Sequence, residues 1–177
     1  HKTELIKLIT EEKIGGLIFF QGDPASQMEL TKCYQDITQT PLWLGMDIEW
    51  GLSMRLSNSI HYPYQMTLGA MDNDSLVYEM GAQIAQQMKR MGVHVSFSPV
   101  LDVNNNPNNP VINYRSFGEN RENVSEKGLM YIKGLQENGV LACAKHFPGH
   151  GDTDMDSHLA LPTVNHNRNR LDSIELF

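Results

Sequence analysis

The sequence is poor in cysteine and has no surplus of positive charge. Its 177 residues include two cysteines, Cys33 and Cys143, which lie in different segments without metal-ligand spacing. We therefore expect two buried free thiols and no disulfide. The net charge of −7 argues against a basic face that could neutralise phosphates, so nucleic acid is not an expected partner.

Long apolar runs are also lacking. No segment approaches the roughly 20 apolar residues that a membrane-spanning helix needs, so no membrane span is expected. Residues 1–13, "HKTELIKLITEEK", are charged and amphipathic and do not have the pattern of a signal peptide. The cellular compartment stays open.

Length and pattern indicate one α/β unit. A chain of 177 residues with 40% apolar and 20% charged residues is typical of a single soluble domain with a buried core. Short apolar segments alternate with amphipathic ones, which predicts parallel strands joined by helices. The expected strands are residues 15–20, 41–47, 93–103 and 140–147. The expected helices are residues 23–38, 73–92 and 120–139, with Asp23 and Pro24 starting the first and Gly92 ending the second.

Polar residues at the strand ends decide between two architectures, an open doubly wound sheet and part of a (β/α)8 barrel. No G-x-G-x-x-G or Walker sequence follows any strand, which disfavours the first. Asp47, Lys145 and His146 end strands and Asp102 lies late in another, as on a barrel's catalytic face. A full barrel needs about 250 residues, so we expect a partial (β/α)8 TIM barrel of about four parallel strands. Half a barrel leaves two strand edges unpaired and one sheet face uncovered, which favours self-association.

One stretch, "KHFPGHGDTDMDSH", combines three histidines, three aspartates and a lysine. A metal site is disfavoured, because the "PG" turn between His146 and His150 prevents a helix that would aim both rings at one ion. The following aspartates resemble the start of a calcium loop, but Ser157 stands where glycine is needed and Thr163 where a glutamate belongs. A plain surface loop has to explain a lysine at the end of a buried strand. No metal or cofactor is expected.

The third explanation for this stretch is acid/base chemistry. Asp156 and His158 are two residues apart, so in an extended segment both side chains point to the same side. A carboxylate beside an imidazole fixes the tautomer of the ring and favours its protonated form. Lys145 and His146 would then bind substrate hydroxyls as donors.

The same residues resemble a known signature. "KHFPGHGDTDMDSHLALP" resembles the K-H-[FI]-P-G-H-G-x4-D-S-H-x3-P signature of family 3 glycoside hydrolases, in the version of the β-N-acetylglucosaminidase branch. "GMDIEWGLSMRL" resembles the family's D-x-E-G-G-x-x-x-R segment, and "SFSPVLDV" and "RSFGEN" resemble two further segments. The resemblance covers residues 15–162.

This resemblance implies a bacterial, retaining exo-β-N-acetylglucosaminidase that acts on peptidoglycan-type or chitooligosaccharide substrates, in the cytoplasm or periplasm. It implies that His158, supported by Asp156, protonates the leaving oxygen and later deprotonates water. Asp102 would support the pocket floor. The residues implied to bind the sugar are Asp47, Arg55, Arg115, Lys145 and His146.

Two departures from the family pattern stand out. Trp50 replaces the first glycine of the "E-G-G" turn and is expected to reshape the pocket near Asp47. The family's nucleophile is an aspartate on a later strand with no counterpart in residues 1–177, and the family's first strand has none either. Asp152 and Asp154 lie on the acid's own loop and cannot attack the opposite face of the sugar. We therefore expect residues 1–177 alone to be inactive.

Simpler roles and other functions stay open. Asp47 could be a turn or cap residue, Arg55 a solvated charge, and Arg115 a partner of Glu119 within its own loop. A β-glucosidase or β-xylosidase of the same family is the alternative enzyme. The alternative from another class is a non-catalytic sugar-binding relic.

Overall fold

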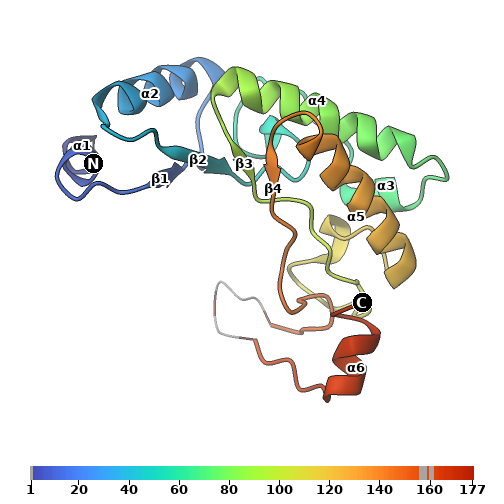
Figure 1. Ribbon diagram of the computed structural model, residues 1–177. Coiled ribbons are helices and arrows are strands. Elements are labelled where there is room, and N and C mark those ends of the chain that lie inside the picture. Colours follow the sequence, from blue (N-terminus) through green and yellow to red (C-terminus); the bar gives the residue numbers. More distant parts are fainter. Residues whose placement is uncertain (1, 156–158, 160–161) are drawn as a thin grey trace.

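A parallel four-stranded sheet forms the centre of the computed structural model, which describes residues 2–155, 159 and 162–177 (Figure 1). The strands run in the order β1-β2-β3-β4 and are parallel throughout, so the expected sheet of about four parallel strands is confirmed. They are β1 (Gly16–Ile18), β2 (Trp43–Met46), β3 (Val95–Ser96) and β4 (Leu141–Ala142). Each strand is shorter than predicted, and the pairing of β3 with β4 resumes beyond them as a separate parallel bridge between Val100 and Lys145.

The helices that join the strands lie where the amphipathic pattern predicts them. They are α2 (Pro24–Ile37), α4 (Ser75–Met91) and α5 (Arg121–Gln136), preceded by α1 (Lys2–Thr10). Asp23 caps α2 by accepting a hydrogen bond from the Ser26 amide at 3.1 Å, and Gly92 ends α4 with a φ of 70°, as predicted. The short elements were not predicted: η1 (Leu52–Met54), α3 (Gln65–Gly69), η2 (Asn113–Arg115) and α6 (Arg168–Ser173).

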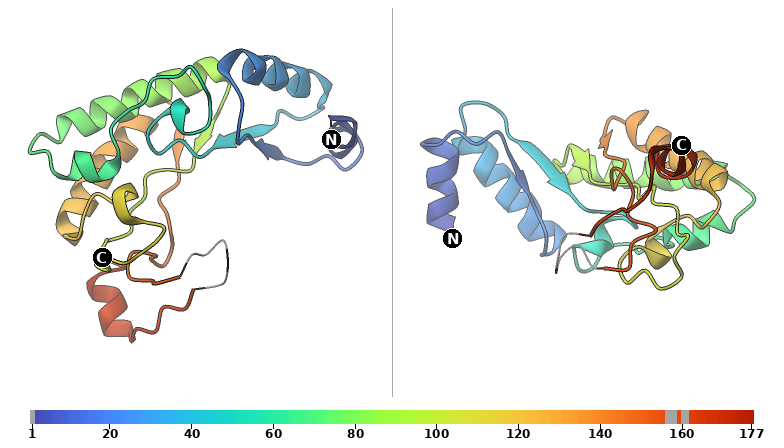
Figure 2. Two further views of the ribbon diagram at one scale, coloured as in Figure 1. Left: turned by 180° about the vertical axis from the view of Figure 1, so that it is seen from behind. Right: turned by 90° about the horizontal axis from the view of Figure 1, so that it is seen from below.

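Helices cover the outer side of the sheet (Figure 1 and Figure 2), and the apolar core lies between them and the strands. Met80, Met88 and Met91 of α4 are buried there, as core packing predicts. α4 and α5 cross closely through glycines, since a Cβ on Gly134 would lie 2.3 Å from the Tyr78 carbonyl oxygen. A smaller cluster joins α1 and α2 to β1 and β2. The core therefore fixes the strands from one side.

The other side of the sheet is open. Ile18, Trp43 and Leu141 point to it and are about half exposed (53%, 58% and 49%), and no described helix covers it. Cys143 alternates onto the same side and is exposed. Both cysteines are free, as expected, but the prediction that both are buried is wrong, because Cys143 lies on this uncovered face and Cys33 is only partly buried.

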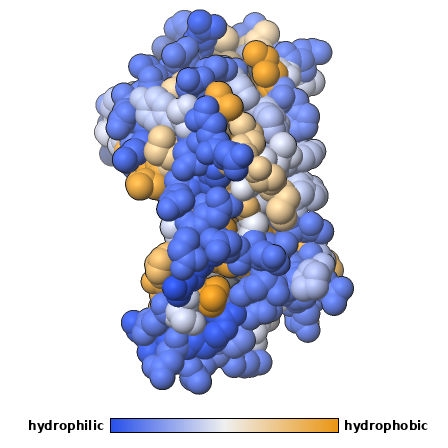
Figure 3. Space-filling model, turned by 90° about the vertical axis from the view of Figure 1, so that its right-hand side faces the viewer, coloured by the Kyte–Doolittle hydropathy of each residue, from blue (hydrophilic) through white to orange (hydrophobic). Residues whose placement is uncertain are grey.

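No helix within the described ranges is long and apolar enough to cross a bilayer. The side that lies on the right of Figure 1 is mostly hydrophilic, with small, separate apolar areas (Figure 3).

Candidate active site

Charged side chains converge where β2 and β4 end. Asp47 follows β2 directly, and its carboxylate accepts hydrogen bonds from Lys145 Nζ at 2.8 Å and Arg55 Nη2 at 2.9 Å. Lys145 is held in place by its backbone, since its amide donates to the Pro99 carbonyl at 3.1 Å and its carbonyl accepts from the Leu101 amide at 2.6 Å. The carboxyl ends of β2 and β4, the parallel strands on either side of β3, thus bring together residues 98 positions apart.

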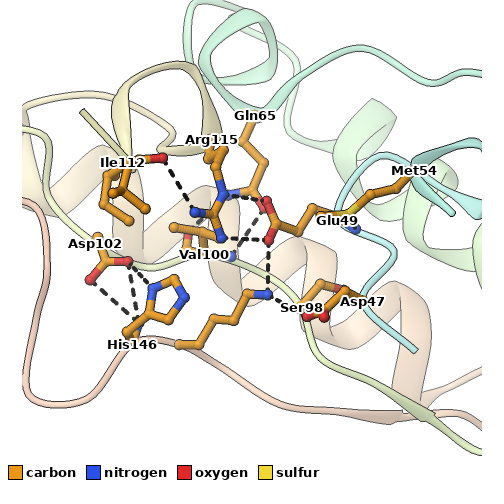
Figure 4. A network of polar contacts seen from close by, with 12 residues as sticks. Asp47, Glu49, Met54, Gln65, Ser98, Val100, Asp102, Ile112, Arg115 and His146 are labelled. Carbon is orange, nitrogen blue, oxygen red and sulfur yellow. Dashed lines mark hydrogen bonds and ion pairs between the residues drawn. The ribbon is translucent and has the colours of Figure 1, made fainter. Parts of the chain in front are cut away.

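These side chains line a hollow of about 460 Å³ on the open side of the sheet. The five residues expected to bind the sugar all line it, which places their charges in one pocket. They are Asp47, Arg55, Arg115, Lys145 and His146. Figure 4 shows Asp47, Arg115 and His146 among the polar contacts of this region.

Glu49 also belongs to this pocket and was missed by the sequence reasoning. Its side chain is 0% exposed, and its two oxygens accept from Arg115 Nε at 2.9 Å and Arg115 Nη2 at 2.8 Å. Lys145 Nζ lies 2.8 Å from the same carboxylate. A buried carboxylate needs such partners, since an unpaired buried charge is strongly unfavourable. Glu49 stands two residues after Asp47, a spacing that puts both on one side of an extended segment, and that spacing could have identified it.

The cations of the pocket keep both carboxylates ionised. Burial acts to raise the pKa of Glu49, but hydrogen bonds and charge from Arg115 and Lys145 outweigh it and hold the pKa below its ordinary value. Burial also acts to raise the pKa of Asp47, and Lys145 and Arg55 hold that pKa below its ordinary value as well. The pocket therefore keeps acceptors and donors side by side at neutral pH.

These shifts predict how stability depends on pH. The folded protein binds fewer protons at Asp47 and Glu49 than the unfolded chain does, so the ion pairs contribute fully above the ordinary pKa values of 3.8 and 4.5. Their contribution is lost as pH falls through the lower pKa values of the folded state. In urea unfolding between about pH 7 and about pH 3, the free energy of unfolding of Lys145→Met should approach that of the wild type as pH falls. Parallel pH curves for the two proteins would contradict this.

Asp102 lies behind the pocket and is 2% exposed. One carboxylate oxygen, Oδ2, is 2.6 Å from His146 Nδ1, and the other, Oδ1, accepts from the His150 amide at 2.6 Å. The His146 amide lies 3.3 Å from both oxygens. Asp102 therefore supports the pocket from behind, as the resemblance implied, and has no access to it.

Two simpler roles considered for the arginines are wrong. Arg115 pairs with Glu49, because the 3₁₀ turn η2 (Asn113–Arg115) directs it to the pocket and away from Glu119. Arg55 is no solvated charge, since its side chain is 19% exposed and bonded to Asp47. The expected acid/base residues Asp156 and His158 lie outside the described residues.

Trp50 turns its ring to other aromatic side chains. Its ring packs edge-on against Tyr64 at 4.9 Å and lies 6.4 Å from Tyr114, while His61 packs on Tyr64 at 5.2 Å. Trp50 is not among the residues that line the described hollow. Its ring therefore packs on Tyr64 and on Tyr114, the chain neighbour of Arg115, and the expected effect of Trp50 on the shape of the pocket stays a prediction.

A second polar cluster joins residues 152 and 166–175. Asp152, His166 and Glu175 come close enough to hold a metal ion. Arg170 already pairs with Asp152 at 3.1 Å and with Glu175 at 2.9 Å, and His166 bonds to Asp152 at 2.5 Å. A guanidinium at this position repels a cation, so we interpret the cluster as an ion-pair network that ties α6 to the segment after His150.

All 177 residues match the family model described as the glycosyl hydrolase family 3 N-terminal domain. The chain belongs to this family. It is 38% identical to beta-hexosaminidase A of Pseudoalteromonas piscicida over 98% of this chain and 31% of that protein. The β-N-acetylglucosaminidase structure from Paenibacillus sp. str. FPU-7 is 44% identical and superposes with a TM-score of 0.90 over 97% of this chain and 34% of that one. NagZ from Neisseria gonorrhoeae is 30% identical, with a TM-score of 0.87 over 98% and 53% of the two chains.

Family membership and these superpositions confirm the predicted resemblance and the fold class, an α/β fold that forms part of a (β/α)8 barrel. The chain spans between about a third and about half of the length of these relatives.

Proposed function

We propose that the protein carrying this chain is a retaining exo-β-N-acetylglucosaminidase. The observation that carries the proposal is the buried charged pocket at the strand ends, in which the Asp47 carboxylate lies between Lys145 and Arg55. Such a pocket presents acceptors and donors to sugar hydroxyls on a rigid sheet. The similarity to a β-N-acetylglucosaminidase at 44% identity supports N-acetylglucosamine as the sugar.

In this proposal the described residues bind and orient the sugar. Asp47 accepts hydrogen bonds from sugar hydroxyls, while Lys145, Arg55 and Arg115 donate to them. Glu49 makes no contact with the sugar. It pairs with Arg115 and Lys145 and thereby fixes the positions of both side chains. Holding the sugar ring in one orientation lowers the entropic part of the activation barrier for hydrolysis.

The chemical step is assigned to the segment after His150. His158, oriented by Asp156, donates a proton to the leaving oxygen and then removes one from water. The attacking carboxylate is proposed to come from outside residues 1–177, so that it reaches the opposite face of the sugar. Peptidoglycan fragments and chitooligosaccharides are the proposed substrates.

Hydrolysis by the full-length protein tests the function. We expect kcat/KM for 4-nitrophenyl N-acetyl-β-glucosaminide to exceed that for the matching β-glucoside and β-xyloside by at least about tenfold, the effect of one or two good hydrogen bonds to the acetamido group. A preference for the glucoside or xyloside would support the alternative enzyme. Binding of N-acetylglucosamine without turnover of any of the three substrates would support the sugar-binding relic.

Residues 1–177 expressed alone are proposed to be inactive and to self-associate. Two features support this: the exposed apolar side chains of Ile18, Trp43 and Leu141 on the open sheet face, and the outer edges of β1 and β4, which pair with no further strand of the described residues. Such surfaces pair with other chains. Light scattering of this fragment, compared with the full-length protein, measures the association, and a monodisperse monomer would contradict it.

A further inference from the structure

The contacts of Asp102 determine which nitrogen of His146 carries the hydrogen. Three nitrogen atoms lie within hydrogen-bonding distance of the two Asp102 oxygens. They are the backbone amide of His146, the backbone amide of His150 and the ring nitrogen Nδ1 of His146. A carboxylate offers only acceptors. Nδ1 of His146 must therefore be the protonated nitrogen, 2.6 Å from Oδ2.

The other ring nitrogen then has a defined polarity. In a neutral imidazole with hydrogen on Nδ1, Nε2 has a free lone pair and accepts hydrogen bonds. The His146 side chain is 35% exposed and lines the sugar pocket together with Lys145 and Arg55. Figure 4 shows its ring next to Asp102. Nε2 is therefore the nitrogen available to the pocket.

Nε2 of His146 adds a hydrogen-bond acceptor to a pocket in which most side chains are donors. Lys145, Arg55 and Arg115 can only donate. Glu49 is fully enclosed and already paired with two of these cations, and Asp47 is shared between Lys145 and Arg55. A sugar hydroxyl both donates and accepts, so in a pocket where Asp47 is the accessible carboxylate among three cations, a further acceptor gives a partner to hydroxyl hydrogens that Asp47 does not bind.

We propose that Asp102 is a positioning residue that presents Nε2 of the neutral His146 ring to the sugar as a hydrogen-bond acceptor. This reverses the donor role that the sequence suggested for His146, and it rests on the proposed function, since it concerns sugar binding in the same pocket. The support is rigid: Ser116 Oγ donates to the Asp102 carbonyl at 2.5 Å, and Lys145, next to His146, is bonded through its backbone to residues 99 and 101. Rigid support of this kind is what fixes the orientation of a binding imidazole.

Direct observation of the tautomer is the first test. Long-range ¹H–¹⁵N spectra of the full-length protein at alkaline pH, where neutral rings are seen, should show His146 with hydrogen on Nδ1. Asp102→Asn keeps the shape but offers an amide NH₂ toward the ring, which then has to accept at Nδ1 and carry its hydrogen on Nε2. A wild-type His146 with hydrogen on Nε2 overturns the proposal, even if the Asn variant does not fold.

Fluorinated sugars give the second test. N-acetylglucosamine analogues with fluorine in place of the 3-, 4- or 6-hydroxyl keep a weak acceptor and lose the donor. For one of them we expect calorimetric affinity for the wild type to fall about tenfold, which corresponds to one hydrogen bond. The same substitution should cost less than about twofold in His146→Ala and in Asp102→Asn, where no acceptor faces the hydroxyl.

The outcomes separate the two proposals. An equal fluorine penalty in wild type and His146→Ala overturns the acceptor role of His146 and leaves the proposed function standing. If the parent sugar does not bind the full-length protein at all, the proposed function fails, while the tautomer spectra still decide the role of Asp102.

Discussion

Replacing Glu49 with alanine is expected to lower the free energy of unfolding by about 3–5 kcal/mol, the cost of removing one partner from a buried ion pair. The Glu49 side chain is 0% exposed, and Arg115 beside it is 15% exposed. Without the carboxylate, the guanidinium keeps only the Val111 carbonyl, 3.2 Å away, among its described partners. Lys145 is affected less, because Asp47 remains at 2.8 Å.

Urea unfolding of the full-length protein, followed through the transition of this domain, measures the loss. Glu29→Ala is the matched control, since Glu29 is an exposed carboxylate on α2, and surface substitutions of this kind change stability by about 0.5 kcal/mol or less. Glu49→Gln separates charge from shape, because the amide keeps the volume. Losses of less than about 1 kcal/mol in Glu49→Ala, within the range of an exposed ion pair, would show that the network contributes little to folding.

The position of the site was predictable because it follows from topology. Parallel strands place their carboxyl ends at one edge, so Asp47, Lys145 and His146 had to meet once the strands were assigned. Helix limits were predictable for a local reason, since caps such as Asp23 and Gly92 act within a few residues. Both kinds of inference need only short-range or periodic information.

Partner choice was not predictable, because it is set by contacts between distant segments. Arg115 has Glu119 four residues away, yet it bonds to Glu49, 66 residues earlier. The local pair would be exposed and worth little, whereas the bidentate pair with Glu49 is buried. The exposure of Cys143 was missed for a related reason, because alternation along β4 tells which face a side chain takes and not whether that face is covered.

The proposed tautomer of His146 depends on Asp102, a residue behind the pocket that the sequence motif around His146 does not contain. "KHFPGHG" gives the residue types of the turn, but Asp102 lies 44 residues before His146. Only the folded chain places the Asp102 carboxylate 2.6 Å from Nδ1, where it accepts a hydrogen bond from that nitrogen in the proposed tautomer and leaves Nε2 to the pocket. Residue type therefore indicates that His146 binds the sugar, and geometry indicates with which polarity.

Replacing His158 with alanine is expected to reduce kcat of the full-length protein by about 10²–10⁴-fold on a disaccharide substrate, the usual contribution of a general acid/base. A sugar leaving group departs poorly as an alkoxide, so its cleavage needs the proton that His158 is proposed to supply. The residues proposed to bind the sugar, Asp47, Lys145 and His146, are unchanged in this variant, so KM should change little.

The leaving group provides the internal control for this variant. Formation of the glycosyl-enzyme from a 2,4-dinitrophenyl glycoside needs no protonation, so the burst of phenolate release should persist in His158→Ala while its turnover stays slow. Asp156→Asn should show the same pattern more weakly, since it alters the orientation and charge of the imidazole without removing it. If His158→Ala slowed the burst on the activated glycoside as much as it slowed disaccharide cleavage, the residue would be acting in binding or folding. Protonation of the leaving oxygen would then have to come from another group.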